Sequence, residues 1–468
     1  MENDVDFSVF IQEHLKSRSS TEREALAIAI GFNPLLERKF KLKQLRAAEK
    51  SQDLIIKRAA LTGLAFSTLL DSKGGKEQKK TLQNSLNDPL TTTRMTAAIG
   101  LGVNAYFSNS RKFQKKGYNE FRKKIKKADL VVKQGFAIGL GLLAKYRDTQ
   151  KDSLKAILEA YNPAEMGSPD NYLVGLTLAA INLEKAEDAF DFIVESIIPN
   201  LSNKESRRIA MICTAFLLPL FPDPATRVEK LEKIIKRGVE FHSKFGTDSA
   251  LVLTYLSLLN DEKQQEKFLI RLLGLKDLDP DYEHIFNILK ENKTVSDVLR
   301  ALLQCNTLDV KAAGITASYF LESENSLADL GAFIEEGLQQ RGSGYFDRFL
   351  VLLRAFSFIL IHKEYDRTKE FEAFFHSNDQ RIKRFAGLSY ACLQAMQQNF
   401  QDVYTRLKNE LDEHVRWGLL VGISIYESIG RDILEDELII GLLLLCLGFI
   451  DVSTLLLLSQ AMISKFYQ

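Results

Sequence analysis

The chain has 468 residues, of which 46% are hydrophobic and 26% are charged, with nine prolines and one tryptophan. This composition is typical of a folded protein and argues against a disordered chain, and the scarcity of proline permits long helices. The net charge of +1 hides an asymmetry, because residues 1–160 carry +13 and the remainder carries −12. The basic end therefore suits an anionic partner, although it could equally attract the acidic end or a neighbouring copy.

The N-terminal segment, MENDVDFSVF, is acidic and lacks an apolar run, so we expect no secretory signal there. Residues 1–50 are predicted to form a less regular N-terminal helical cap. The four cysteines are widely spaced and show no CxxC or zinc-ligand pattern: Cys213, Cys305, Cys392 and Cys446. They indicate buried thiols in a reducing compartment, and we expect a cytoplasmic protein.

From residue 51 onward the chain repeats. Four glycines, each within a segment of small and apolar residues, lie 37, 39 and 36 residues apart: Gly63, Gly100, Gly139 and Gly175. The pattern returns around Gly314, Gly387 and Gly418. An amphipathic segment follows each apolar one, as in residues 153–161, where apolar side chains recur at i, i+3, i+4 and i+7. Each unit is therefore predicted to be a helical hairpin.

Stacked hairpins of this kind form an all-α fold, a right-handed superhelical solenoid of roughly ten to eleven units with a period of about 36 residues. We expect the solenoid to cover residues 51–430. A glycine inside a helix costs about 1 kcal/mol relative to alanine. Its recurrence at one place in the unit therefore predicts a close approach of the next hairpin.

Several units begin with an aspartate followed by a basic residue, as at Asp53 with Lys57, Asp309 with Lys311, and Asp379 with Lys383. This pattern resembles the HEAT repeat. The resemblance implies that the aspartate caps the first helix and that the basic residue bridges to the next unit. A second resemblance, to the proteasome/cyclosome-type repeat, rests on the Ala- and Gly-Leu-Gly-containing stretches at 97–102 and 137–141.

The segment 111–127, RKFQKKGYNEFRKKIKK, has nine basic residues and one acid. Tyr118, Phe121 and Ile125 share one helical stripe, which predicts that they face the core. The basic residues form the candidate patch for an anionic partner: Arg111, Lys112, Lys115, Lys116, Arg122, Lys123, Lys124, Lys126 and Lys127. Further basic residues in 38–43 and 76–80 could extend this patch. The alternatives are a merely solvated face, an acidic protein, a nucleic acid or an anionic membrane.

Residues 438–458 are mostly apolar with a single charged residue, Asp451, and are long enough to span a bilayer. Three interpretations stay open: buried helices, an apolar surface for a partner or a second copy, and a membrane anchor. Asp451 could also cap a helix and divide the run in two, which favours buried capping helices over residues 431–468.

No catalytic pattern stands out. The Gly-Leu-Gly stretches and residues 72–81 lack the spacing of nucleotide-binding loops, and the six histidines include no metal-binding pair. We therefore expect no cofactor, no metal and no enzyme activity. The leading hypothesis is a scaffold or adaptor that binds proteins, with an acidic partner for the patch. The alternatives are a nucleic-acid-binding protein using the basic first third and a membrane-associated adaptor.

Overall fold

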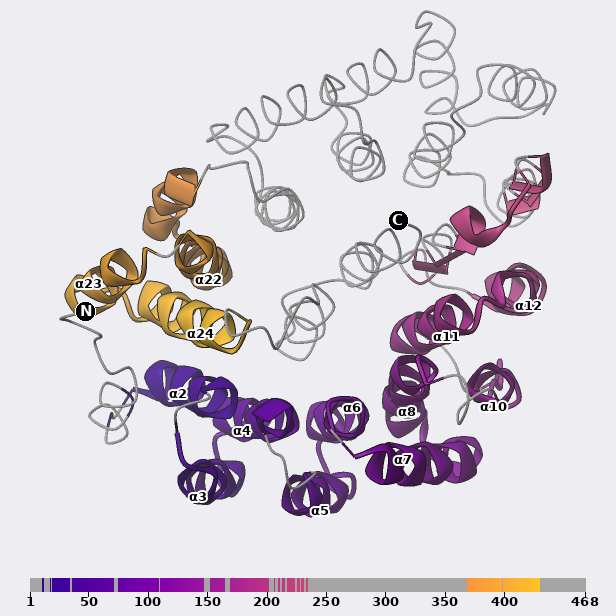
Figure 1. Ribbon diagram of the computed structural model, residues 1–468, viewed down its shortest axis with the longest axis horizontal. Coiled ribbons are helices and arrows are strands. Elements are labelled where there is room, and N and C mark those ends of the chain that lie inside the picture. Colours follow the sequence, from indigo (N-terminus) through magenta and orange to yellow (C-terminus); the bar gives the residue numbers. More distant parts are fainter. Residues whose placement is uncertain are drawn as a thin grey trace, which may run out of the picture. The chain divides into compact units, whose positions relative to one another are not determined.

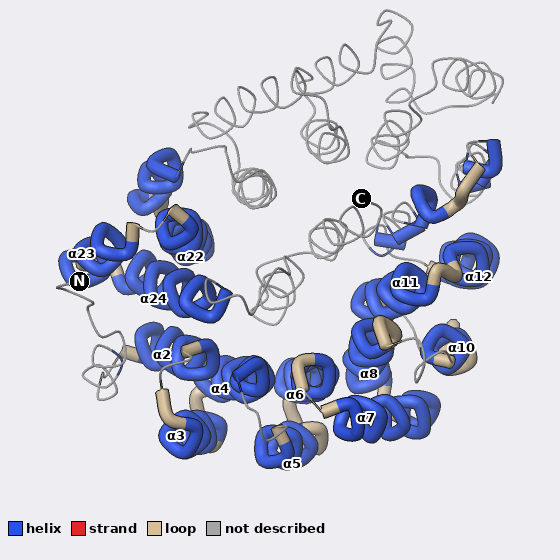
Figure 2. The backbone as a smooth tube through the Cα atoms, viewed as in Figure 1, coloured by secondary structure: helices blue, strands red, loops and turns tan. Residues whose placement is uncertain are grey.

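The computed structural model describes residues 11–234 and 368–429, except for 12–16, 18, 34–35, 71–74, 109, 147–151, 165–168, 398 and scattered positions between 202 and 232. Within this part every regular element is a helix (Figures 1 and 2). The helices run as hairpins packed in chain order, which confirms the predicted all-α solenoid. The superhelical handedness and the number of hairpins stay predictions.

The chain divides into two compact units. The first comprises residues 1–161, 174–179 and 356–468, and the second comprises 162–173 and 180–355. In the first unit we call the leading helix of each hairpin an A helix and the second a B helix. The A helices are α2 (Ser20–Phe32), α4 (Leu54–Phe66), α6 (Thr91–Tyr106), α8 (Leu130–Leu143), α22 (Gln380–Met396) and α24 (Glu413–Ile429). The B helices are α3 (Arg38–Glu49), α5 (Lys76–Ser85), α7 (Arg111–Lys124), α10 (Ser153–Leu158) and α23 (Phe400–Asn409).

Short 3₁₀ turns extend or precede some helices. They are Ser67–Leu70 after α4, Ile125–Lys127 after α7, and Thr368–His376 before α22. In the second unit, α11 (Asp170–Leu183), of which residues 174–179 belong to the first unit, is followed by α12 (Ala186–Phe192). A π-helical turn (Ile193–Ile197) and 3₁₀ turns (Ile198–Asn200 and Leu218–Leu220) come next.

The A helices are buried on almost every side, because α24, α2, α4 and α6 each pack between two other A helices and the A helices also contact B helices. The order of packing is α22, α24, α2, α4, α6, α8, so α2 lies between α4 and α24 (Figure 1). The first described hairpin therefore has a neighbour on both flanks. The predicted domain boundaries at 50 and 430 stay predictions, and residues 431–468 lie outside the described part.

Glycines permit this close packing, as predicted. A Cβ atom on Gly102 would lie 2.5 Å from the Cα of Gly139 on the next A helix, and one on Gly141 would lie 2.5 Å from the carbonyl oxygen of Gly175. A Cβ on Gly418 would lie 2.2 Å from the carbonyl oxygen of Arg384. These backbones are too close for any side chain, so the Gly-Leu-Gly stretches are packing sites between helices.

Aspartates cap four of the A helices, α4, α8, α22 and α24, as the sequence predicts. The Asp53 carboxylate accepts from the backbone N–H groups of Ile55 and Ile56, and Asp379 and Asp412 do the same for α22 and α24. Lys57, four residues after the cap, makes an ion pair with Asp88 at the start of the next hairpin. The predicted cap and bridge are both present.

A buried polar residue near the start of α3, α5 and α7 bonds back to the end of the preceding A helix. Lys41 Nζ donates to the carbonyl oxygen of Asn33 at 2.8 Å, and Gln114 Nε2 donates to that of Ser108 at 2.7 Å. Gln78 occupies the corresponding place in α5 and reaches Ser67 Oγ at 3.5 Å. We call Lys41, Gln78 and Gln114 the anchor residues, because they satisfy polar groups where an A helix ends and set the rotation of each B helix.

Candidate functional site: the basic face of the B helices

Helix α7 has one apolar and one strongly basic face. The Ser110 hydroxyl caps its start by accepting from the N–H of Phe113 at 3.3 Å. Tyr118, Phe121 and Ile125 are buried, as predicted, and Phe113 is buried as well. Phe121 stacks on Phe136 of α8 with ring centroids 5.1 Å apart. All three aromatic residues of the segment therefore serve the core and leave no ring on the surface for a ligand.

All nine residues of the predicted basic patch are exposed. Three of them make ion pairs: Arg122 with Asp152 at 3.3 Å, Lys126 with Glu159 at 2.8 Å, and Lys124 with Glu120 at 2.9 Å. The other six make no ion pair within the described part of the chain: Arg111, Lys112, Lys115, Lys116, Lys123 and Lys127. Excess positive charge is thus left on the outer face of α7.

Acidic residues of the B helices join neighbouring hairpins. The Glu120 carboxylate of α7 forms an ion pair with Lys79 of α5 at 2.6 Å, and it accepts a hydrogen bond from Gln83 of α5 at 2.6 Å. Burial tends to raise the pKa of Glu120, but the hydrogen bonds from Lys79 and Lys124 outweigh it and the pKa is lowered. Glu77 of α5 likewise forms an ion pair with Arg46 of α3 at 3.0 Å. The few acids on these helices are therefore engaged in building the stack.

Of the further basic residues considered for the patch, Lys41 does not belong to it. It is 5% exposed because its ammonium group is turned inward as an anchor residue. Arg38 and Lys79 are engaged by Glu77 and Glu120. The remaining four are exposed and make no ion pair with any described residue: Lys39, Lys43, Lys76 and Lys80.

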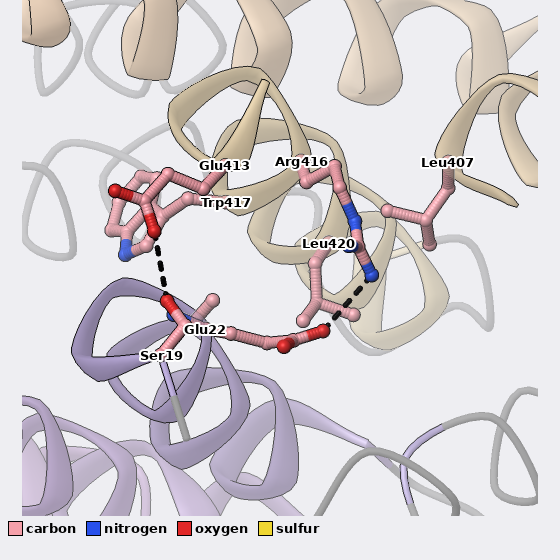
Figure 3. A pocket seen from close by; sticks show the side chains of 8 residues that line it. Ser19, Glu22, Leu407, Glu413, Arg416, Trp417 and Leu420 are labelled. Atoms are coloured by element: carbon pink, nitrogen blue, oxygen red, sulfur yellow. Dashed lines mark hydrogen bonds and ion pairs between the residues drawn. The ribbon is translucent and has the colours of Figure 1, made fainter. Parts of the chain in front are cut away.

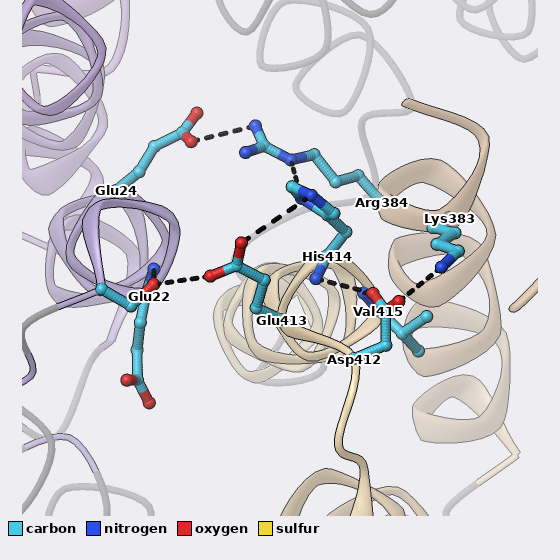
Figure 4. Close-up of polar contacts among 9 residues, drawn as sticks. Glu22, Glu24, Lys383, Arg384, Asp412, Glu413, His414 and Val415 are labelled. Carbon is cyan, nitrogen blue, oxygen red and sulfur yellow. Dashed lines mark hydrogen bonds and ion pairs between the residues drawn. The ribbon is translucent and has the colours of Figure 1, made fainter. Parts of the chain in front are cut away.

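A second polar cluster lies where α24 and α22 meet α2 (Figure 4). Arg384 of α22 donates to Glu24 of α2 at 2.9 Å, and its Nε donates to His414 Nδ1 at 3.2 Å. Burial raises the pKa of Glu24 although Arg384 opposes the rise. Burial, followed by the charge of Arg384, lowers the pKa of His414, which suits a neutral ring that accepts at Nδ1. These contacts join the N-terminal hairpin to the hairpins of residues 380–429.

A pocket of about 60 Å³ lies beside this cluster, between α2 and α24 (Figure 3). Ser19 Oγ donates to Glu413 at 2.9 Å on one side, and Arg416 pairs with Glu22 at 2.9 Å on the other. The pocket has room for a few water molecules. Since its charged groups already pair across the two helices, we interpret it as part of their junction.

Among the described residues, no group of three or more His, Cys, Asp or Glu side chains could hold a metal ion, and no helix is long and apolar enough to cross a membrane. Cys213 and Cys392 are buried, as predicted, and burial raises the pKa of the Cys392 thiol. Cys305, Cys446 and the apolar run 438–458 lie outside the described part.

Comparisons with known proteins identify no family. No family model matches the chain, and no curated protein matches it. Among solved structures, UNC-45 from Drosophila melanogaster shares 14% sequence identity over 98% of this chain and 68% of its own, with a TM-score of 0.33. The packed hairpins themselves show that the chain has a helical-repeat fold.

Proposed function

We propose that this protein is a non-catalytic scaffold or adaptor that binds an acidic protein through the basic face of its B helices. The observation that carries the proposal is the charge of residues 111–127, of which six basic residues are exposed and make no ion pair with any described residue. Lysine side chains held on a rigid helical stack attract and orient an anionic partner, mainly by raising its rate of association.

The buried aromatic residues favour a protein over a single-stranded nucleic acid. Binding to single strands usually relies on bases that stack on exposed aromatic rings. Phe113, Tyr118 and Phe121 are at most 7% exposed and are held in the core. Duplex DNA or RNA, which can be bound through phosphates alone, is kept as the alternative.

We also propose that the hairpins are HEAT-like. The support is the capping aspartate with a basic residue that bridges to the next unit, found both at Asp53 with Lys57 and at Asp379 with Lys383. The close approach at Gly102 and Gly139 supports the narrower likeness to proteasome/cyclosome-type repeats. A cytoplasmic location is part of the same proposal.

The test is affinity capture with the full chain from lysate with and without nuclease treatment, comparing wild type with a variant in which Lys115, Lys116, Lys123 and Lys127 are changed to Glu. None of these side chains makes an ion pair with a described residue, so the variant should fold normally. The control changes the same four residues to Arg and keeps the charge. Proteins retained by wild type and by the Arg variant, and lost from the Glu variant, would support the proposal. Identical retention by all three, or retention that nuclease abolishes, would contradict it.

A further inference from the structure

The exposed lysines of three successive B helices occupy equivalent places in the repeat. In each helix, one lysine stands two residues before the anchor residue and one stands two residues after it. The pairs are Lys39 and Lys43 around Lys41, Lys76 and Lys80 around Gln78, and Lys112 and Lys116 around Gln114. The intervals between equivalent positions are 37 and 36 residues, which is the period of the hairpins.

The anchors decide where these lysines point. Each anchor side chain is buried and directed at the A helix of its own hairpin. Successive residues of an α-helix are rotated by about 100°, so positions two residues away on either side lie about 160° from the anchor direction. The six lysines therefore project away from the A helices, and all six are exposed.

None of the six makes an ion pair with a described residue, whereas basic residues elsewhere on the same helices do. Arg38 and Arg46 of α3 reach Glu77, Lys79 of α5 reaches Glu120, and Arg122 of α7 reaches Asp152. The basic residues thus separate into two sets, one that joins hairpins and one that faces outward. Solubility alone does not require lysine at the same two positions in three successive units.

We propose that these six lysines, the lysine lattice, form a docking surface for an extended acidic polypeptide that runs across α3, α5 and α7. The inference rests on the proposed function and specifies the partner's geometry. Ion pairs between long side chains join these helices in sequence, from α3 to α5 through Arg46 and Glu77 at 3.0 Å and from α5 to α7 through Lys79 and Glu120 at 2.6 Å. An extended chain advances about 3.3–3.6 Å per residue. Asp or Glu recurring every few residues would therefore bring a carboxylate over each helix in turn.

A lysine ammonium group pairs with a carboxylate or a phosphate as a compact point charge, so the lattice selects for negative charge and not for one of these two groups. The observation that favours a polypeptide over a single-stranded nucleic acid is that residues 111–127 offer no exposed aromatic ring for a base to stack on.

The repeat supplies a matched control. In α23 the corresponding core position is Val403, which is buried, and the residues two before and two after it are Gln401 and Thr405, both exposed. This hairpin has the same geometry without the lysines. Changing Gln401 and Thr405 to Glu adds the same acids at equivalent positions outside the lattice.

The experiment measures fluorescence anisotropy of labelled synthetic peptides with the full chain at low ionic strength, where the Debye length is about 30 Å. One peptide repeats Ser-Glu-Gly, a second has the same composition with its glutamates contiguous, and a third probe is a duplex oligonucleotide. The spaced peptide should bind most tightly. Reversal to Glu of the pair in α3, in α5 or in α7 should each weaken it by about three- to tenfold, and Q401E/T405E should leave it unchanged.

Three results would contradict the proposal that the lysine lattice docks an acidic polypeptide. Loss confined to the α7 pair would reduce the site to one helix and leave the proposed function intact. Equal binding of both peptides, or of neither, would remove the spacing argument, while the capture experiment would still judge the proposed function separately. Tighter binding of the duplex, weakened by all three reversals, would show that the occupant is a nucleic acid.

Discussion

Arg416 Nη2 on α24 lies 2.9 Å from the Glu22 carboxylate on α2, although the two residues are 394 positions apart. The same kind of contact joins consecutive hairpins, as where Arg94 of α6 reaches Asp129 at the start of α8 at 3.4 Å. Helix α2 thus makes with α24 the kind of ion pair that α6, α8 and α24 make, at or near their first residues, with the A helix before them. The N-terminal hairpin occupies the place of the next repeat after α24.

We expect the stability of the contact between α2 and the hairpins of residues 380–429, the junction, to depend on Arg384 more than on Glu24. Arg384→Ala leaves the Glu24 carboxylate buried without its cation and should lower the free energy of unfolding by about 2–3 kcal/mol. Glu24→Ala leaves an arginine that still contacts His414 and lies 5.1 Å from the Trp417 ring, so it should cost only about 1 kcal/mol. Urea unfolding of both variants and the double variant measures this. Additive effects would show that the pair is not coupled.

Trp417 should report on this junction specifically, because it is the only tryptophan and is 1% exposed on α24. In Arg384→Ala, the fluorescence transition in urea should precede the loss of helical circular dichroism, since the junction would open before the remaining hairpins. In wild type the two transitions should lie closer together. Coincident transitions in the variant would contradict local opening.

The contact between Lys57 and Asp88 should make stability depend on acid pH. Burial tends to raise the pKa of Asp88, but hydrogen bonds from Lys57 and from the N–H of Leu90 outweigh it and hold the pKa below 3.8. The unfolded state then binds the proton more readily, so this contribution is complete above pH 3.8 and is lost as the pH falls through the folded pKa. Lys57→Met should destabilise the protein at neutral pH, and its difference from wild type should shrink below pH 3.8. A difference that grew in acid would contradict this assignment.

Gly102→Ala should destabilise the packing of α6 on α8. Its Cβ would lie 2.5 Å from the Cα of Gly139, and a backbone cannot give way as a side chain can. We expect a loss of about 2 kcal/mol or more, despite a gain of about 1 kcal/mol in helix propensity. Gly100→Ala is the control, because its nearest neighbours are the Leu82 and Ala65 side chains at 3.1 and 3.2 Å. If Gly102→Ala and Gly100→Ala lowered the unfolding temperature equally, the close approach of the α6 and α8 backbones would not be the cause of the loss.

Adjacent lysines on α5 should differ in their effect on stability. Lys79→Ala removes the contact with Glu120 of the next hairpin and should cost about 1 kcal/mol, because both side chains are at most 15% exposed. Lys80→Ala should change stability by less than about 0.5 kcal/mol, because that side chain is exposed and makes no ion pair with a described residue. Paired thermal melts check this, and equal losses would contradict the division between joining and outward-facing residues.

The repeating pattern of the sequence was enough to predict the hairpins, the capping aspartates and the glycine contacts. Each of these features lies within one unit or between one unit and the next, so the 36-residue repeat is enough to locate it. It also predicted that Tyr118, Phe121 and Ile125 face the core, since a single helical stripe decides that. It did not predict that Lys41 is buried, because a lysine near the start of a helix gives no sign that a carbonyl oxygen of the preceding helix lies within its reach.

The sequence by itself determined the unit, because apolar periodicity, caps and small residues act over a few turns of helix. Only the tertiary structure decided that α2 packs against α24, since two surfaces separated by almost 400 residues match through their shapes and charges, which no local pattern records. The structure also decided which basic residues are engaged by acids. That division depends on distances between neighbouring helices, and it leaves the outward lysines of α3, α5 and α7 as the surface to test for binding.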